Sequence, residues 1–214
     1  MNDENVNKKY ELTDDVIECD GRILHRIKAV RNVREDVPAG TLGGYVEREC
    51  NLPHYGNAWV YGNAKVYGNA WVYGNAKVYG NAEVYGNAKV YGNAWVYGNA
   101  WVYGNAWVYG NAKVYGNAKV YGDAEVYGDA EVYGDADYMV FKNTWSSGRW
   151  FSCFRDKRGV LMWKVGCFYG TSAELIDKAY KDSKLSGDCY KAAVEMAEKV
   201  FSMTKQDSDS NKED

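Results

Sequence analysis

One hexapeptide, YGNAxV, is repeated without insertion or deletion from Tyr55 to Tyr138. Its fourteen copies use only nine residue types: Tyr, Gly, Asn, Ala, Val, Trp, Lys, Glu and Asp. A strict short period of this kind is the mark of a solenoid, in which each coil buries its apolar side chains only against the next coil. We therefore expect a solenoid with a non-repetitive segment at each end.

The unit can be written N-A-x-V-Y-G, in which Ala and Val alternate with the variable residue x. At the two-residue period of a strand, Ala and Val point inward, whereas x and Tyr point outward. The Gly-Asn pair that follows is suited to positive φ in a tight turn. A short strand and a corner every six residues predict a three-sided parallel β-prism over residues 55–138, with three units per coil and a little under five coils.

The spacing of aliphatic and small residues resembles the hexapeptide-repeat superfamily, in which an aliphatic residue is followed four positions later by a small one. Val60 with Ala64 fits this pattern, whereas Tyr61 departs from the family's usual Gly, Ala, Glu or Asp. The resemblance implies a left-handed β-helix and a trimer packed along the prism faces.

The residues at position x alternate between aromatic and charged coils. The successive coils carry Trp59, Lys65 and Trp71; Lys77, Glu83 and Lys89; Trp95, Trp101 and Trp107; Lys113, Lys119 and Glu125; then Glu131 and Asp137. One interpretation is that these side chains hold the coils in register, with ~0.5–1 kcal/mol for each exposed cation–π or ion-pair contact. The other is that the ring of Trp95, Trp101 and Trp107, here called the Trp belt, binds a partner together with Trp59 and Trp71.

The last three units replace Asn with Asp, at positions 123, 129 and 135. Acidic residues at the end of a ladder discourage another chain from stacking on an open coil edge. The three Asp lie on different corners rather than in one calcium-binding loop, so no metal site is expected.

Residues 10–54 are expected to cap the first coil, after a disordered tail at 1–9. Residues Tyr10 to Val33 indicate a hairpin around Asp20-Gly21, a strong type I′ turn signal. Running the six-residue register backwards places Val46 and Leu52 at the Ala position of a degenerate first coil.

Residues 139–204 indicate a small α+β domain, followed by a disordered tail at 205–214. The segments DYMVFKN, RWFSCF and VLMWKVGCF indicate three strands, the last two joined by the turn DKRG. A capping box at Thr171 and Glu174 predicts a helix from Ser172 to Asp182, and a second helix is expected from Asp188 to Met203. The buried helical residues are expected to be Leu175, Ile176, Ala179, Tyr180, Ala193, Ala197, Val200 and Phe201.

The composition excludes several classes of protein. The net charge is −3 with dispersed Lys and Arg, which argues against nucleic-acid binding. No apolar run reaches transmembrane length, and the first residues lack a signal-peptide core, so a cytoplasmic protein is expected. The five scattered Cys indicate reduced thiols.

Catalytic residues are scarce. The repeat contains no Ser, Thr, Cys, His, Met or Arg, and the only histidines, His25 and His54, precede it. This disfavours the acyltransferase activity, dependent on a catalytic His, that many superfamily members have, and no cofactor is expected. After the repeat, Arg149, Trp150 and Arg155 are candidate ligand-binding residues if both Arg share one strand face, although a solvated face is favoured. Cys153 is expected to be a buried apolar residue.

The whole chain resembles uncharacterised phage and prophage proteins through KYEL, DGRILHRIKAVR, LGGYVE, the YGNA array and the C-terminal VGCFYGT. This resemblance implies a phage accessory protein in the bacterial cytosol. We expect a non-catalytic binding or scaffold protein that acts as a homo-oligomer on a host protein, such as a component of a defence system, or on a small ligand. An acyltransferase-like enzyme and a carbohydrate-binding or virion surface element remain alternatives.

Overall fold

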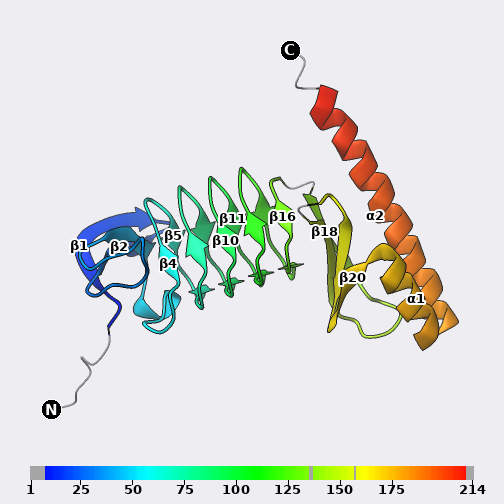
Figure 1. Ribbon diagram of the computed structural model, residues 1–214, viewed down its shortest axis with the longest axis horizontal. Coiled ribbons are helices and arrows are strands. Elements are labelled where there is room, and N and C mark those ends of the chain that lie inside the picture. The colour runs from blue at the N-terminus through cyan, green and yellow to red at the C-terminus, as the bar shows by residue number, and fades with distance from the viewer. Residues whose placement is uncertain (1–7, 135–136, 157, 211–214) are drawn as a thin grey trace.

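The computed structural model describes residues 8–134, 137–156 and 158–210. A prism of stacked coils lies between an N-terminal antiparallel hairpin and a C-terminal sheet that carries two helices (Figure 1). Most of the predicted tail at 1–9 and the last residues of the tail at 205–214 lie outside the described ranges.

The prism has three faces because each short strand pairs in parallel with the strand three units further along the chain. The first face consists of β4 (Trp59–Val60), β7 (Lys77–Val78), β10 (Trp95–Val96), β13 (Lys113–Val114) and β16 (Glu131–Val132). The second consists of β5 (Lys65–Val66), β8 (Glu83–Val84), β11 (Trp101–Val102) and β14 (Lys119–Val120). The third consists of β6 (Trp71–Val72), β9 (Lys89–Val90), β12 (Trp107–Val108) and β15 (Glu125–Val126). The predicted mainly β, three-sided parallel solenoid is confirmed, and its handedness stays a prediction.

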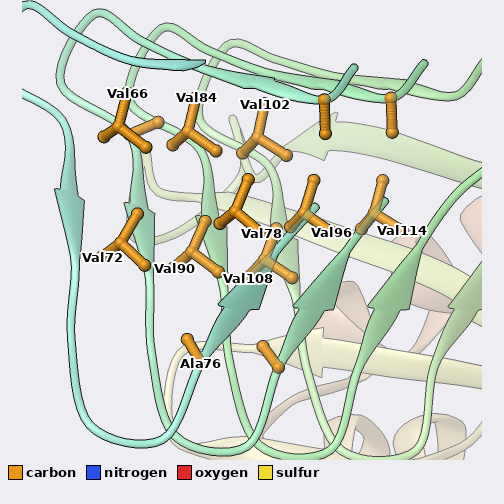
Figure 2. Packing of buried hydrophobic residues seen from close by; sticks show 14 of the residues in the cluster. Val66, Val72, Ala76, Val78, Val84, Val90, Val96, Val102, Val108 and Val114 are labelled. Atoms are coloured by element: carbon orange, nitrogen blue, oxygen red, sulfur yellow. The ribbon is translucent and has the colours of Figure 1, made fainter. Parts of the chain in front are cut away.

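The Ala and Val of the repeat line the prism core, and all of them are fully buried from Ala58 to Val132. Figure 2 shows the Val side chains of equivalent strands in rows, for example Val66, Val84 and Val102. Backbone amides also link the coils, as where Trp95 N donates to Ala112 O at 2.9 Å. Small side chains keep the interior narrow, so much of the cohesion between coils comes from hydrogen-bonded ladders.

The corners depend on Gly alone for positive φ. Gly98, at +71°, is representative, whereas Asp20 is the one non-Gly residue with positive φ among the described residues. The Asn of the predicted Gly-Asn pair has a different role, because its side chain links successive coils. Asn75 Nδ2 donates to Asn93 Oδ1 at 3.1 Å, and equivalent bonds run along the other corners.

These Asn ladders explain the Asp of the final units. On two of the corners the amides donate toward the C-terminal end, where the Asp123 and Asp129 carboxylates accept the last bond at 2.9 and 3.1 Å. At the opposite end of one ladder, Arg48 Nη2 donates to Asn69 Oδ1 at 3.4 Å. An anion at the donor end and a cation at the acceptor end both match the aligned amide dipoles. Asp135 lies outside the described residues.

The N-terminal hairpin has the predicted strands and turn. β1 (Tyr10–Cys19) pairs with β2 (Arg22–Ala29), and Asp20 and Gly21 have φ of 51° and 69°, as a type I′ turn requires. β3 (Leu42–Val46) then joins β2 to β5 of the prism, followed by the 3₁₀ helix η1 (Glu49–Asn51).

The predicted register of the first coil is wrong. Val46 pairs with Val66 and so occupies the Val position rather than the Ala position. The reason is that η1 inserts residues between β3 and the first complete unit, which breaks the six-residue count. Leu52 is nevertheless buried at the end of the prism core.

The C-terminal sheet has four strands in the order β17 (Tyr138–Lys142), β18 (Trp150–Arg155), β19 (Leu161–Val165), β20 (Phe168–Thr171). The predicted single strand VLMWKVGCF is two strands, because Gly166 at φ 56° makes a turn between them. Alternate residues of β18 face opposite ways: Phe154 packs on the prism core, and Phe151 and Cys153 pack under the helices. The sheet therefore closes the prism and supports the helices.

Both predicted helices are present. α1 (Ser172–Asp182) has the predicted bounds and the Thr171–Glu174 capping box. α2 (Lys184–Ser210) begins before Asp188 and continues past Met203 into the predicted tail, since each added helical residue gains a backbone bond despite a polar composition. Tyr180 is 43 % exposed rather than buried, because its ring lies against Gly187 and its hydroxyl donates to Asp188.

Candidate interaction surface

The Trp belt lies at the middle of the prism, on β10, β11 and β12, with one ring on each face (Figure 1). The alternation of the strand directs these side chains outward, while the neighbouring Val fills the core. Trp95, Trp101 and Trp107 are 38, 38 and 36 % exposed. The belt therefore presents nearly the same aromatic area in three directions.

Each belt ring is held by a Lys from an adjacent coil. Lys77 Nζ lies 5.3 Å from the Trp95 ring centroid, and Lys89 Nζ lies 4.6 Å from that of Trp107. On the second face the cation comes from the following coil, where Lys119 Nζ lies 5.1 Å from Trp101. At ~0.5–1 kcal/mol each, these contacts orient the rings more than they stabilise the fold.

Tyr side chains contact the same rings at their edges. Tyr79, Tyr85 and Tyr91 each meet a belt Trp in a T-shaped contact at 6.3–6.4 Å. These Tyr also stack along the prism, as where Tyr85 and Tyr103 lie 4.9 Å apart with an interplanar angle of 1°. Burial raises the pKa of Tyr91 to about 12, so the phenols stay neutral at physiological pH. The belt is thus a rigid surface of cations and aromatic edges.

Several Lys side chains of the prism form ion pairs with carboxylates. Lys65 Nζ lies 2.8 Å from Glu83 on the second face, and Lys113 Nζ lies 2.9 Å from Glu131 on the first. The hydrogen bonds from Lys65 to Glu83 and from Lys113 to Glu131 favour the charged form of each Lys. They therefore raise the pKa of both Lys. Lys77 also contacts Asp36 of the loop before β3, at 3.3 Å.

Two further Trp of the repeat have different environments. Trp71 is 42 % exposed, as predicted for position x. Trp59 is fully buried, which contradicts its assignment to an exposed binding surface. The reason is the N-terminal segment, which covers the first coil and places the Tyr10 ring 6.2 Å from Trp59 in an edge-on contact.

The condition set for the predicted Arg pair, one strand that contains both residues, is not met. Arg149 is exposed and precedes β18, whereas Arg155 ends it. Arg155 instead anchors α2: its Nη2 donates to Phe201 O at 3.1 Å, and its guanidinium lies 4.9 Å from the Phe201 ring. Of this group, Trp150 is exposed, with Lys142 Nζ 5.5 Å from its ring.

Sequence reasoning missed a recess beside Trp150. The second face ends at β14, one strand short of the first face, and the space between this corner and β17 is a recess of about 340 Å³. Its walls are Tyr121, Gly122, Asp123, Tyr138, Met139, Val140 and Trp150. The sequence offered one signal for this recess. Five complete coils need fifteen units, and the repeat has fourteen, so the last coil is one strand short.

His54 and Cys153 have structural environments. His54 Nδ1 accepts from Lys9 N at 3.2 Å, and its ring lies 4.6 Å from that of Tyr10; burial lowers its pKa. Cys153 is fully buried, and burial raises the pKa of its thiol, as expected for an apolar packing residue. All five Cys are unpaired. Within the described residues no cluster of His, Cys, Asp and Glu fits a metal ion, and no helix is both long and apolar enough to span a membrane.

A family model described as the YdcK beta solenoid repeat matches residues 58–74, 82–98, 88–104 and 94–110. The matched segments lie in the prism and include the whole Trp belt. The match agrees with the stacked coils and supports a repeat β-solenoid. A comparison with curated proteins found no match.

Proposed function

We propose that the protein is a non-catalytic scaffold that binds a protein partner through its prism. The observation that carries this proposal is the Trp belt, in which rings on all three faces are oriented by Lys and Tyr and remain more than a third exposed. Aromatic residues are enriched at protein interfaces, and rings already held in place lose little entropy on binding. A rigid prism also sets the distance between the hairpin and the C-terminal domain.

The ring contacts favour a protein partner over a glycan. Sugars stack on open aromatic faces, but each belt Trp has a Lys over its ring, and the Tyr rings stack on one another. The environment of His54 gives no support to an acyltransferase, because its Nδ1 accepts a backbone amide and it packs on Tyr10.

The setting that we propose is the cytosol of a bacterial host. The order of hairpin, YGNA array and C-terminal domain resembles phage and prophage proteins, and the unit resembles the hexapeptide-repeat superfamily. In this setting a host protein, such as a component of a defence system, is the partner that we favour.

Affinity purification from bacteria that express the protein tests this proposal. Three forms are compared: the unaltered chain, Trp95→Lys/Trp101→Lys/Trp107→Lys, and the control Met203→Lys, which changes an exposed apolar residue of α2, outside the prism. We expect one host protein to co-purify with the unaltered chain and the control but not with the triple variant, whose fold is checked by circular dichroism. Equal recovery with the triple variant, or no specific partner, would contradict the proposal, and acetyl-CoA turnover lost on His54→Ala would support an enzyme instead.

A further inference from the structure

The three prism faces differ in the charges that flank the Trp belt. Strand pairing places Lys77 and Lys113 on either side of Trp95 on the first face, and Glu83 and Lys119 on either side of Trp101 on the second. On the third face Trp107 lies between Lys89 and Glu125. A face with flanking charges of opposite sign can pair with a second copy of itself. In an antiparallel pair related by a two-fold axis between the two central Trp rings, each charge of one copy lies opposite the counter-charge of the other.

The third face also has an unsatisfied cation. Lys89 lies in register between Trp71 and Trp107, and within the described part of the chain no carboxylate lies within ion-pair distance of it. Its Nζ lies 4.6 Å from the centroid of the Trp107 ring. Trp71 and Trp107, on either side of Lys89, are both exposed, whereas Trp59 is buried at the corresponding position on the first face.

The opposing anion on this face is accessible. Glu125 uses Oε2 to accept from Tyr109 at 3.0 Å, and Lys164 lies 3.9 Å from the same oxygen. Oε1 has no hydrogen-bond partner within the described residues, and the side chain is 38 % exposed. Lys89 and Glu125 therefore each retain capacity for one further charged contact.

The other two faces are less suitable. On the first face a two-fold contact would oppose Lys77 and Lys113, which repel. On the second face both oxygens of Glu83 are occupied, Oε1 by Lys65 at 2.8 Å and Oε2 by Tyr67 at 3.1 Å. The hairpin turn also lies against that face, where the Tyr67 hydroxyl oxygen lies 3.1 Å from Asp20 Oδ2.

We propose that the third face binds a second copy of this chain, in an antiparallel two-fold pair in which Trp107 packs on Trp107 and each Lys89 meets the other copy's Glu125. Because the belt lies on the third of about five coils, this arrangement aligns the two prisms along their whole length. At a strand spacing of about 4.8 Å the face is only about 20 Å long, so the contact is small and the pair should dissociate on dilution. The inference rests on the proposed function, since it takes the belt to be a binding surface, and it differs from the trimer that the superfamily resemblance implies.

Charge exchange tests the pairing, with solution mass measured by light scattering and sedimentation over a range of concentrations. We expect the unaltered chain to dimerise, and Lys89→Glu or Glu125→Lys to weaken dimerisation by about 10- to 100-fold, because each change turns two attractive contacts into repulsive ones. The double exchange Lys89→Glu/Glu125→Lys should restore the dimer. This recovery keeps the test valid if a single variant folds poorly.

Matched changes on the other faces provide the controls. Lys113→Glu/Glu131→Lys exchanges an ion pair on the first face, and Trp101→Lys alters the belt on the second; both should leave the dimer intact, whereas Trp107→Lys should abolish it. A monomeric or trimeric unaltered chain, or a double exchange that folds and stays monomeric, overturns the two-fold pairing. If the chain is monomeric but the host partner is still lost with the triple belt variant, only this inference fails; if neither association depends on the belt, the proposed function fails too.

Discussion

The prism and the C-terminal domain bury apolar side chains in contrasting ways. In the prism every coil contributes the same Ala and Val, and between Val60 and Val132 these small residues fill the interior at 0 % exposure. In the C-terminal domain a few large residues, including Phe151, Trp163 and Phe201, form most of one cluster. Stability is therefore spread evenly along the prism and concentrated at a few positions in the domain.

This difference separates the consequences of single substitutions. In the prism the corners use the same Gly conformation with positive φ. A substitution at one of these Gly is therefore costly, although the side chains of the prism core are small. In the C-terminal domain the loss of one ring leaves a large cavity. Substitutions in the two regions test this contrast.

The largest effect is expected for Trp163→Ala. Trp163 is fully buried, its ring lies 5.7 Å from Phe141, and its Nε1 donates to Ser172 at 3.1 Å. Removing a buried Trp costs about 3–5 kcal/mol, which should unfold the helices and sheet before the prism. Amide hydrogen exchange checks this: protection should fall in the C-terminal domain and persist in the coils, while Trp107→Ala, which removes an exposed ring, should change neither region by much. Equal loss of protection in the coils would show that the two regions unfold as one unit.

The prism was predictable from the sequence because its period sets every strand and corner at once. The alternation of Ala and Val with x specifies which side chains face inward, and the count of three units per coil places Trp95 above Lys77 and below Lys113, as the strand pairing confirms. The same register predicted that the three Trp of the belt lie in one coil, one on each face.

The errors occur where the period ends. Val46 is two residues out of register because η1 interrupts the count, and Trp59 is buried because Tyr10, far away in sequence, covers the first coil. Such long-range contacts leave no periodic signal. The recess beside Trp150 was missed for the same reason, because it forms between the last corner and a strand whose position no repeat specifies.

An intermediate effect is expected for Gly98→Ala at a prism corner. Gly98 has φ of +71°, and an added Cβ would lie 3.1 Å from Gly116 N and O in the next coil. Strain of ~1–2 kcal/mol and the forced separation of two coils should together lower the free energy of unfolding of the prism by about 2–3 kcal/mol. Chemical denaturation followed by circular dichroism measures this change.

Gly122→Ala separates these two contributions. Gly122 has a similar φ of +66°, but nothing lies within 4 Å of its added Cβ. This variant should lose only the strain contribution, about 1–2 kcal/mol. If the two variants lose the same free energy, close stacking of the corners contributes little, and the even distribution of stability along the prism must come from the strands alone.

The last effect, similar in size to that of Gly122→Ala, concerns Lys9, which closes the end of the prism. Lys9 is fully buried, and its Nζ donates to Ala58 O at 3.0 Å; burial, followed by the charge of Arg31, lowers its pKa to about 8. Between this pKa and the value of 10.5 in the unfolded chain, only the unfolded state keeps the proton, so stability rises with pH. From pH 8 to about pH 10 the contribution of Lys9 should grow by about 2 kcal/mol, at 1.36 kcal/mol per pH unit before allowance for solvent screening.

The readout is the free energy of unfolding of the unaltered chain minus that of Lys9→Met at each pH. Burial raises the pKa of Cys153 and Tyr10, which lowers stability as pH rises through the unfolded pKa of these groups, but both occur in the two proteins and cancel in the difference. A difference that rises toward pH 10 would confirm that the N-terminal segment closes the prism with a desolvated cation. A flat difference would mean that the Lys9 ammonium reaches water, and that the first coil is less tightly covered than the burial of Trp59 indicates.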